Sequence, residues 1–526
     1  MGAVFFYLKL KEWVINASIL HMSDVKRKIR VRAAPSPTGY VHIGNFRTFL
    51  FNMLFARHEG GSLILRIEDT DRTRYVEGAI EKMLAAYKSL DLIFDEGMML
   101  DENGLVTERG EYGPYLQSKR LDLYQKHVQI LLENKKAYYC FCSPERLDQL
   151  RAEQIALKKP PKYDGLCKAL ADEEVQKKVG EFKALGKSPV VRQAIDAAGE
   201  TTIKDIIYGD IVVQNKTLDD QILLKSDGFP TYHLAVVVDD HFMEISHVIR
   251  GDEWISSTPK HVLLYEAFGW EPPQFAHLPL IVNPDKTKLS KRQGDVAIED
   301  YLNKGYLKEA LVNFIAFLGW NPKTTQEIFS LDELIQQFDL TKVHRSAAVF
   351  DLDKLDWING LYIRKLTPEQ LAKELLPYLV RAGLVREGEV DQGFLEEVAR
   401  IEQDRLKKLS DVVDKTGYLF GDVQLEAGKI VWKKSDAATT KQVLEKLIKL
   451  FDQIPDTEFT APQLEEKLKE FIAQNNFDNG TVLWPLRYSL TGLDKSPGPF
   501  DVLSVLHRGY GKELIKKRLN SAISLL

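Results

Sequence analysis

The fold is decided by residues 28–54, which read KIRVRAAPSPTGYVHIGNFRTFLFNML. Positions 29, 31 and 33 are apolar and alternate with two arginines and an alanine, and this period of two predicts a strand. Pro35 and Pro37 then forbid regular structure and predict a turn that reaches Gly39. Beyond the turn, apolar residues at 46, 49, 50, 53 and 54 recur at helical spacing. The stretch therefore predicts a strand, a turn and a helix.

A second strand follows this helix. Residues 63–68 form a short, mostly apolar run that suits a buried strand, and strand–helix–strand is the opening unit of a doubly wound parallel sheet. Further parallel strands are predicted at 234–238 and 245–249. From about residue 361 onward the pattern predicts amphipathic helices, including 443–451 and 464–471. The predicted fold class is α/β, a Rossmann-like doubly wound parallel sheet followed by an all-α region.

The chain divides into six predicted parts. Residues 1–21 are interpreted as an extension or a misassigned start, because Met22-Ser23-Asp24 looks like a natural beginning. Lysine-rich residues 111–232 are predicted to interrupt the sheet as an insertion. The other predicted boundaries are 22–110 and 233–285 for the two halves of the sheet domain, 286–360 for the region that carries Lys288, and 361–526 for the helical domain.

Composition and charge exclude some classes of protein. A chain of 526 residues is too long for one core, and 44% hydrophobic with 28% charged residues is typical of a folded cytoplasmic protein. No uncharged apolar run approaches the ~20 residues of a membrane span, so no membrane partner is expected. The net charge of −5 does not indicate a nucleic-acid binder, although such binding depends on local basic patches. Three cysteines provide no disulfide framework and favour a reducing compartment.

A candidate phosphate site follows the first strand. His42-Ile43-Gly44-Asn45 stands at the predicted helix N-terminus, where unpaired N–H groups and the helix dipole favour a phosphate. Gly44 lets a nucleotide approach the backbone, and His42 can donate a hydrogen bond to a phosphate oxygen. Taken alone, the pattern also fits a capped helix start with a chance histidine. The sequence has no Gly-x-x-x-x-Gly-Lys-Ser/Thr pattern, which excludes the usual P-loop.

A second basic motif lies at 288–292. Lys288-Leu289-Ser290-Lys291-Arg292 supplies three cations and a hydroxyl within five residues. A basic loop that closes on a triphosphate can stabilise charge on departing pyrophosphate, whereas an isolated cluster of this kind is usually a solvated surface run. Both motifs in one chain, in this order around a split α/β sheet, favour the formation of an adenylate from ATP.

These motifs resemble those of the bacterial-type glutamyl-tRNA synthetases of class I. The matching stretches are 32–39, 42–45, 66–71, 230–234, 238–241, 248–251, 283–286, 288–292, 350–357, 486–487 and 491–492. The resemblance implies a glutamate–tRNA ligase that activates L-glutamate with ATP and transfers it to the 3′-terminal adenosine of tRNA(Glu). It also implies that 111–232 bind the acceptor stem, that 286–360 contact the tRNA stem and that 361–526 bind the anticodon. We expect a monomer.

The resemblance also assigns residues to the site. For glutamate it implies Arg32, Ala34, Ser36, Glu68, Tyr232, Val236 and Arg250, and two arginines suit a substrate with an extra carboxylate. For ATP it implies Thr38, His42, Gly44, Glu253, Ile281, Lys288 and Lys291, with Mg²⁺ held mostly by phosphate oxygens and water. For catalysis it implies His42, Gly44, Asn45, Lys288, Ser290, Lys291 and Arg292. Many class I enzymes carry a second histidine where Asn45 stands, which puts the role of that position in doubt.

The three cysteines have a metal-like spacing, Cys140-x-Cys142 followed by Cys167. This spacing resembles the zinc knuckle in the acceptor-binding insertion of some members of the family. Structural zinc takes four ligands, and the position of the relatives' fourth ligand, a histidine, is Ala169 here. Asp172 or water would be a poor substitute. We therefore expect a metal-free remnant rather than bound Zn²⁺.

Four alternatives remain from the sequence. The enzyme could also charge tRNA(Gln), and anticodon contacts in the helical tail would decide that choice. A glutaminyl-tRNA synthetase shares both phosphate motifs, but Arg32 with Arg250 points to glutamate. A short paralogue that glutamylates a modified tRNA base would lack the helical tail. A non-catalytic tRNA-binding relative would have no reason to keep His42, Glu68 and Lys288 together.

Overall fold

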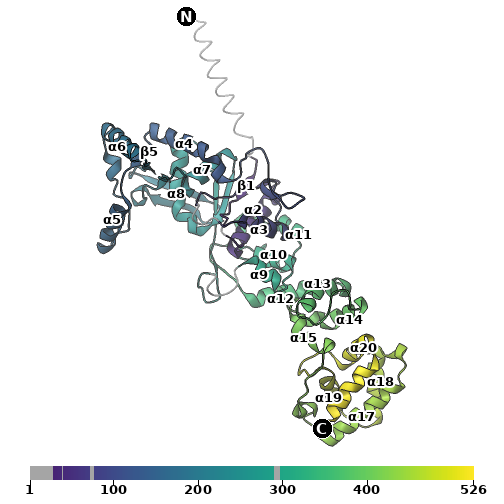
Figure 1. Ribbon diagram of the computed structural model, residues 1–526. Helices are drawn as coiled ribbons and strands as arrows, with labels where there is room; N and C mark the ends of the chain where they lie inside the picture. Colours follow the sequence, from purple (N-terminus) through teal and green to yellow (C-terminus); the bar gives the residue numbers. More distant parts are fainter. Residues whose placement is uncertain (1–27, 38, 72–75, 290–296) are drawn as a thin grey trace. The chain divides into compact units, whose positions relative to one another are not determined.

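The computed structural model describes residues 28–37, 39–71, 76–289 and 297–526 (Figure 1). Contacts divide the chain into two units. The first comprises the chain up to Glu299 together with Ile315–Phe350, and the second comprises Asp300–Phe314 with Asp351–Leu526. The predicted site residues Thr38, Ser290, Lys291 and Arg292 lie outside the described residues.

The first unit is built around parallel strands. In one sheet β1 (Arg30–Ala33), β2 (Ser62–Leu65) and β3 (Glu96–Leu100) pair in parallel in this order, and β4 (Val106–Arg109) is antiparallel to β3. In a second sheet β10 (His247–Gly251), β11 (Gln274–Leu278) and β7 (Glu200–Asp205) pair in parallel, and β8 (Gly209–Gln214) is antiparallel to β7. The prediction of a parallel α/β fold is confirmed.

The two sheets adjoin at β1 and β10. The Ser246 N–H donates to the carbonyl of Arg30 at 2.9 Å, and the Ser246 hydroxyl accepts the Arg30 N–H at 2.8 Å. The chain leaves β1 toward β2 on one side, while β10 lies on the other side. This arrangement is the switch point of a doubly wound sheet, and crevices for ligands form there at the carboxyl ends of the strands.

The predicted first helix is present as α2 (Ile43–His58), and His42 is its N-cap residue. The residues whose spacing predicted it, at 46, 49, 50, 53 and 54, are all buried. Most of the remaining helix surface is buried as well, because α2 contacts β1, β2, β10 and α11 (Leu331–Gln337). The predicted strand at 63–68 is β2, which is shorter by a few residues.

One predicted element is wrong. The run Leu234–Val238 was predicted as a strand, but it belongs to the helix α7 (Tyr232–Phe242). All five residues are almost completely buried, because this part of α7 packs in the apolar core that includes Tyr124, Leu223 and Leu264. A short apolar run has no periodicity that separates a strand from a fully buried helix, and burial overrides the β-propensity of valine. The strand predicted at 245–249 exists as β10, two residues later.

The segment predicted as an insertion carries helices and a small sheet. The sheet has the order β5 (Ala137–Cys140), β6 (Val190–Gln193) and β9 (Ile222–Leu224). The helices are α4 (Leu121–Glu133), α5 (Pro144–Ala156) and α6 (Asp172–Ala184). Because β7 and β8 come from this segment and β7 pairs with β11, the segment is hydrogen-bonded to the main sheet.

The remaining elements of the first unit are α3 (Ala79–Ser89), α8 (Thr258–Phe268) and the parallel pair β12 (Ile281–Val282) and β13 (Ala348–Val349). Two helices, α9 (Ile298–Asn303) and α10 (Lys308–Ala316), cross the division between the units in the sequence. The predicted domain boundaries stay predictions.

The second unit is helical beyond residue 351. In the green-to-yellow part of Figure 1, α17, α18 and α19 pack against α20 around one apolar core. A smaller core joins α13, α14 and α15. The helices are α12 (Leu352–Ile363), α13 (Pro368–Arg381), α14 (Gln392–Glu402), α15 (Asp411–Phe420), α16 (Ala427–Ile430), α17 (Ala437–Gln453), α18 (Ala461–Gln474), α19 (Asn479–Thr491) and α20 (Pro499–Ile523). The predicted helical tail is confirmed.

Two adjacent carboxylates of α7 tie the first unit together. Asp239 accepts hydrogen bonds from Arg120 Nε at 2.7 Å, from Gln117 Nε2 at 2.8 Å and from the Tyr124 hydroxyl at 2.8 Å. Both carboxylates are buried, and Arg66 of the chain that leaves β2 lies 2.8 Å from Asp240. α7 is thereby joined to the sheet and to α4 by charges that water does not reach.

Replacing Asp239 should therefore destabilise the first unit. Asp239→Asn leaves Arg120 without its charged partner, and breaking a buried pair from one side costs about 3–5 kcal/mol. Chemical denaturation of the purified chain measures the loss. Asp148→Asn is the matched control, because its ion pair with Arg151 is 73% and 64% exposed and should contribute no more than about 1 kcal/mol. Equal losses of unfolding free energy in the two variants would contradict the proposed contribution of Asp239 to stability.

Candidate active site

A cavity of about 790 Å³ lies at the switch point of the sheet. It is bounded by the exits of β1 and β10 and by the N-terminus of α2. Twelve of the predicted site residues line it, namely Arg32, Ala34, Ser36, His42, Gly44, Asn45, Glu68, Tyr232, Arg250, Glu253, Ile281 and Lys288. The structure therefore brings together, around one cavity, residues that are up to 256 positions apart (Arg32 to Lys288).

Of the described residues predicted for glutamate, ATP or catalysis, Val236 is the one that the cavity lining does not include. Its side chain is 2% exposed and belongs to the apolar core around α7. The helical turn of α7 explains this placement. Tyr232 at the start of the helix lines the cavity, whereas Val236, one turn later, packs in the core.

His42 caps the helix that faces the cavity. Its Nδ1 accepts the N–H of Gly44 at 2.9 Å. A backbone N–H can only donate, so in the neutral ring the proton is on Nε2. His42 therefore presents a donor at Nε2, as a phosphate-binding role requires. The Gly44 N–H is thus used by the histidine side chain.

Arg250 is a buried cation whose hydrogen-bond partners are neutral. Its Nη1 donates to the Tyr232 hydroxyl at 2.9 Å, its Nη2 to the Thr258 hydroxyl at 2.8 Å, and its Nε to His277 Nε2 at 3.2 Å. The side chain belongs to a residue that is 5% exposed. Among the residues that the structure describes, no carboxylate oxygen lies within 4.0 Å of the guanidinium. A buried charge without a counter-charge is costly, which suits a site that awaits an anionic ligand.

Arg32 differs from Arg250, because its charge is balanced by the protein. Its Nε lies 3.1 and 3.3 Å from the two carboxylate oxygens of Asp240. Asp240 also accepts from Arg66, whose Nη2 in turn donates to Glu68 at 3.0 Å. The order Arg32, Asp240, Arg66, Glu68 alternates in sign, so this ladder has no net charge. Arg250 thus adds a positive charge that this ladder does not neutralise.

Burial and charge shift the protonation of the ladder in opposite directions. Burial raises the pKa of Glu68, and the neighbouring Arg66 and Arg32 offset only part of that effect. Burial would also raise the pKa of Asp240, but the charges of Arg32 and Arg66 outweigh it and hold that pKa below its ordinary value. Asp240 is thus the fixed anion of the ladder. Glu68, at its end in the cavity, would gain from a cationic ligand.

The other side of the cavity carries the residues predicted for ATP. Glu253 lies in a short 3₁₀ helix, Asp252–Ser257, that follows β10, and Ile281 begins β12. Lys288 is exposed, and its backbone bridges to Val282 of β12. Apolar Ile281 and cationic Lys288 thus line the same cavity as the N-terminus of α2.

Several residues in the cavity lining or in the ion pairs behind it were missed by the sequence prediction. Arg66, Asp239 and Asp240 form the buried ion pairs, and Lys225 and Trp254 line the cavity. A signal for the ion pairs was present, because Arg66 interrupts one apolar run and Asp239-Asp240 ends another. A charge inside a buried run requires a partner, although the sequence does not identify that partner.

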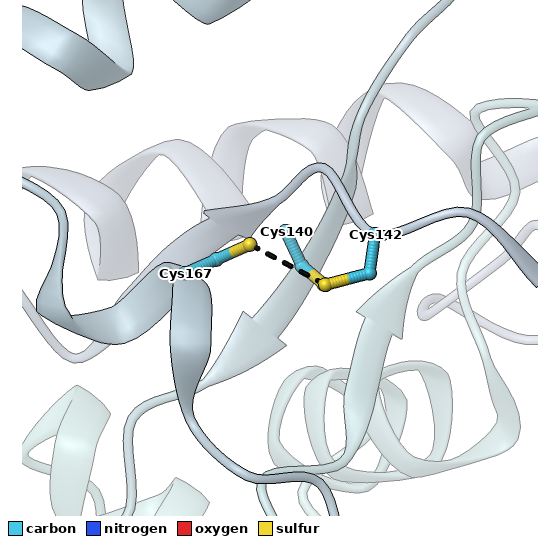
Figure 2. Close-up of side chains that lie close together, drawn as sticks. All are labelled: Cys140, Cys142 and Cys167. Carbon is cyan, nitrogen blue, oxygen red and sulfur yellow. Dashed lines mark hydrogen bonds between the residues drawn. The ribbon is translucent and has the colours of Figure 1, made fainter. Parts of the chain in front are cut away.

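The three cysteines converge on one another (Figure 2). Their sulfur atoms all lie within 4.8 Å of one another, and the Cys142 and Cys167 sulfurs are 3.6 Å apart. The Tyr163 hydroxyl lies 3.5 Å from the Cys140 sulfur and 3.4 Å from the Cys142 sulfur. Asp172, the substitute ligand considered from the sequence, is exposed and pairs with Lys135. Tyr163 is therefore the fourth oxygen or sulfur donor that this cluster offers.

Protonation of the cluster is uneven. Hydrogen bonds from Cys167 and Tyr163, against the opposing effect of burial, lower the pKa of Cys140. The hydrogen bond to Cys140, together with burial, raises the pKa of Cys167. One thiolate thus disfavours a second one nearby, which is the behaviour of coupled sites. A cation would relieve this repulsion, so the donor set fits Zn²⁺.

Two family models match this chain. Residues 28–357 match the family described as tRNA synthetases class I (E and Q), catalytic domain, and residues 370–523 match an anticodon binding domain. The chain belongs to this class I family. The two matches cover the α/β domain and the helical tail that the sequence predicts.

The relatives identify the branch of the family. A protein of Alkaliphilus metalliredigens named Glutamate--tRNA ligase is 45% identical over 498 residues, which cover 93% of this chain and 98% of that protein. A protein of the same name from Clostridioides difficile is 45% identical over 497 residues, with coverages of 93% and 98%. The predicted enzyme class, a glutamate–tRNA ligase, is confirmed.

Solved structures agree with this placement. The crystal structure of a glutamate tRNA ligase from Elizabethkingia meningosepticum in complex with its amino acid is 36% identical, with a TM-score of 0.83. The match covers 94% of this chain and 99% of that one. A glutamate–tRNA synthetase from Elizabethkingia anophelis is 35% identical, also with a TM-score of 0.83, and the match covers 94% of this chain and 100% of that one. Among the described residues, no helix combines the length and the apolar character that a membrane span requires.

Proposed function

We propose that this chain forms glutamyl-adenylate from L-glutamate and ATP and transfers the glutamate to the 3′-terminal adenosine of tRNA(Glu). The observation that carries this proposal is the buried guanidinium of Arg250, which lines the cavity and has no carboxylate partner among the described residues. A substrate with a side-chain carboxylate supplies the missing counter-charge.

The cavity offers a complementary group for each charge of glutamate. The side-chain carboxylate lies at Arg250 and Tyr232, whose hydroxyl accepts from Arg250 and so has its own proton to donate. The α-ammonium lies at Glu68, the carboxylate at the end of the ion ladder. Ala34 and Ser36 form the wall at the exit of β1. The α-carboxylate then remains free to react.

In the reaction, this α-carboxylate attacks the α-phosphorus of ATP, and pyrophosphate leaves with its bonding electron pair. His42 Nε2–H and Lys288 stabilise the charge that develops on the phosphates, while Glu253 and Ile281 hold the adenosine. Mg²⁺ accompanies ATP and shields phosphate charge. The protein contributes mainly position and electrostatic stabilisation, because neither step forms a covalent bond to a side chain.

The transfer step requires tRNA. In this proposal residues 111–232 hold its acceptor end, and the helical second unit contacts the anticodon. The ribose hydroxyl of the terminal adenosine attacks the activated carbonyl, and AMP leaves. Whether tRNA(Gln) is charged as well depends on the anticodon contacts.

Glutamate-dependent exchange of pyrophosphate into ATP tests the whole proposal. We expect exchange and acylation with purified tRNA(Glu). Acylation of tRNA(Gln) in addition would identify a non-discriminating enzyme. Exchange with glutamine instead of glutamate would identify a glutaminyl-tRNA synthetase. No exchange with either amino acid would overturn the proposal in favour of a non-catalytic tRNA-binding protein.

Arg250→Ala should impair the use of glutamate selectively. Removing one partner of a buried charge pair costs about 2–5 kcal/mol, which is roughly a 30- to 4000-fold loss in kcat/KM for glutamate. The KM for ATP should change little. Arg518→Ala is a matched control, because Arg518 is also buried but donates to backbone carbonyls of the second unit. Steady-state exchange kinetics with each substrate varied in turn measure both effects. An unchanged kcat/KM for glutamate would contradict the assignment.

Lys288→Ala should slow activation without weakening glutamate binding. The substitution removes the ammonium group that stabilises the charge developing on the phosphates. We expect a fall of roughly 100-fold in the exchange rate, as for other single electrostatic donors. Lys286→Ala is the control, because Lys286 is equally exposed two residues earlier but does not line the cavity. A similar loss in both variants would indicate a general effect of surface charge. We also expect Lys291→Ala to abolish most activation in this assay while the affinity for tRNA, measured by a separate binding titration, stays nearly intact, because the motif implies a role in the departure of pyrophosphate.

We propose that the cysteine cluster holds Zn²⁺ through Cys140, Cys142 and Cys167, with the Tyr163 oxygen as fourth ligand. We expect about one zinc ion per purified chain, with a role in folding of the insertion. Tyr163→Phe should weaken retention against a chelator by roughly tenfold or more. Tyr138→Phe is the control, because the Tyr138 hydroxyl donates to Asp220 instead. Zinc-free wild-type protein would support the metal-free remnant expected from the sequence.

A further inference from the structure

We propose that Asp205 and His277 are positioning residues that orient Arg250 and keep its charge available for the substrate carboxylate. The inference rests on the proposed function, because it concerns how the amino-acid site is held. Neither residue lines the cavity, and neither is predicted from the sequence. Their effect on the substrate therefore passes through Arg250.

The hydrogen bonds determine which nitrogen of His277 carries the proton. His277 Nδ1 lies 2.7 Å from Asp205 Oδ2, and the same oxygen accepts the backbone N–H of His277 at 3.1 Å. An ionised carboxylate can only accept, so Nδ1 carries the proton. The lone pair of Nε2 then faces the Nε–H of Arg250 at 3.2 Å. Asp205 thus selects the tautomer that can accept from Arg250.

A second histidine, His261, also directs a ring lone pair at Arg250. His261 Nδ1 lies 3.4 and 3.5 Å from the two terminal nitrogens of Arg250, and these can only donate. His261 Nε2 therefore carries the proton and donates to His233 Nδ1 at 3.0 Å. Burial and the charge of Arg250 both lower the pKa of His261. Burial, with a contribution from Arg250, also lowers the pKa of His277 and outweighs the opposite effect of its hydrogen bond to Asp205. Both rings stay neutral, and both direct a lone pair at the guanidinium.

The position of Asp205 is itself rigid. Its other oxygen accepts the backbone N–H groups of Ile207 at 2.9 Å and Tyr208 at 2.8 Å. Asp205 is the last residue of β7 and pairs in register with Phe275 of β11, two residues before His277. Asp205, His277 and Arg250 are all buried, with exposures of 5%, 0% and 5%, so water does not replace a lost acceptor. The geometry of Arg250 is thus set by the sheet.

This arrangement favours a carboxylate over a carboxamide. A carboxylate in direct contact with Arg250 would position the guanidinium equally well, but it would also cancel its charge. His277 supplies an acceptor without charge, and it keeps the anion Asp205 one imidazole away. Arg250 therefore remains a cation toward the cavity, and a substrate amide gains far less from it than a substrate carboxylate.

The test compares variants of full-length protein in the exchange assay with tRNA(Glu). His277→Phe keeps a ring but removes the acceptor, and we expect the KM for glutamate to rise roughly 10- to 100-fold, because a buried charged donor is left unpaired. The KM for ATP and the kcat should stay within about twofold of wild type. His277→Gln, whose amide oxygen can accept from Arg250, should recover part of the loss. Asp205→Asn should raise the KM for glutamate in the same direction, because its NH2 group must face the N–H groups either of His277 or of Ile207 and Tyr208, and so cannot keep the hydrogen bonds of the carboxylate.

His127→Phe is the matched control. His127 is 5% exposed and contacts the rings of Phe242, Phe268 and Trp270 edge-on or tilted, outside the cavity lining. Thermal unfolding of each variant separates loss of fold from loss of substrate binding. If His277→Phe does not fold, His277→Gln and Asp205→Asn carry the same comparison. An unchanged glutamate KM, or equal rises for glutamate and ATP, would overturn the positioning role.

Different results would refute the positioning role and the proposed function. Wild-type protein that shows no glutamate-dependent exchange refutes the proposed function. Wild-type exchange that Arg250→Ala impairs, but that His277→Phe and Asp205→Asn leave unchanged, refutes the positioning role alone. A rise in glutamate KM with partial recovery in His277→Gln supports it.

Discussion

The structure of the first unit depends on two buried carboxylates that are adjacent in the sequence, Asp239 and Asp240 of α7. Each neutralises arginines from elements that are far away along the chain, Arg120 of the segment before α4 and Arg32 of β1. Arg66 touches both carboxylates and carries the network on to Glu68. Buried charges are costly unless they are paired, so this network permits very few alternative arrangements of helix and sheet.

The same network determines the electrostatics of the cavity. Arg32 is neutralised by Asp240, and Glu68 is held at the cavity by Arg66. Arg250 stands apart, because His277, Thr258 and Tyr232 position it without neutralising it. In the proposed function, Glu68 would meet the ammonium group of the substrate and Arg250 its additional carboxylate. The ion pairs that stabilise the first unit would then also position Glu68.

Local patterns predicted most elements, and their failure has a clear cause. Period two predicted β1, and helical spacing predicted α2 and the helices around 443–451 and 464–471. The run 234–238 misled because these five residues of α7 are all apolar and buried, so the run itself has no polar position to reveal a helical period. Val236, which the resemblance assigned to the glutamate site, lies in this core as well.

By itself, the sequence determined the class of fold, the helix start at His42 and the resemblance that indicated glutamate. These features depend on neighbours in the chain: alternation, proline turns and short motifs. Only the tertiary structure decided the partners of the charges. It placed Asp240 on Arg32, His277 with Asp205 behind Arg250, and Tyr163 among three cysteines. The physical reason is that a buried charge or thiol specifies that a partner must exist, whereas the folding of distant segments determines which residue it is.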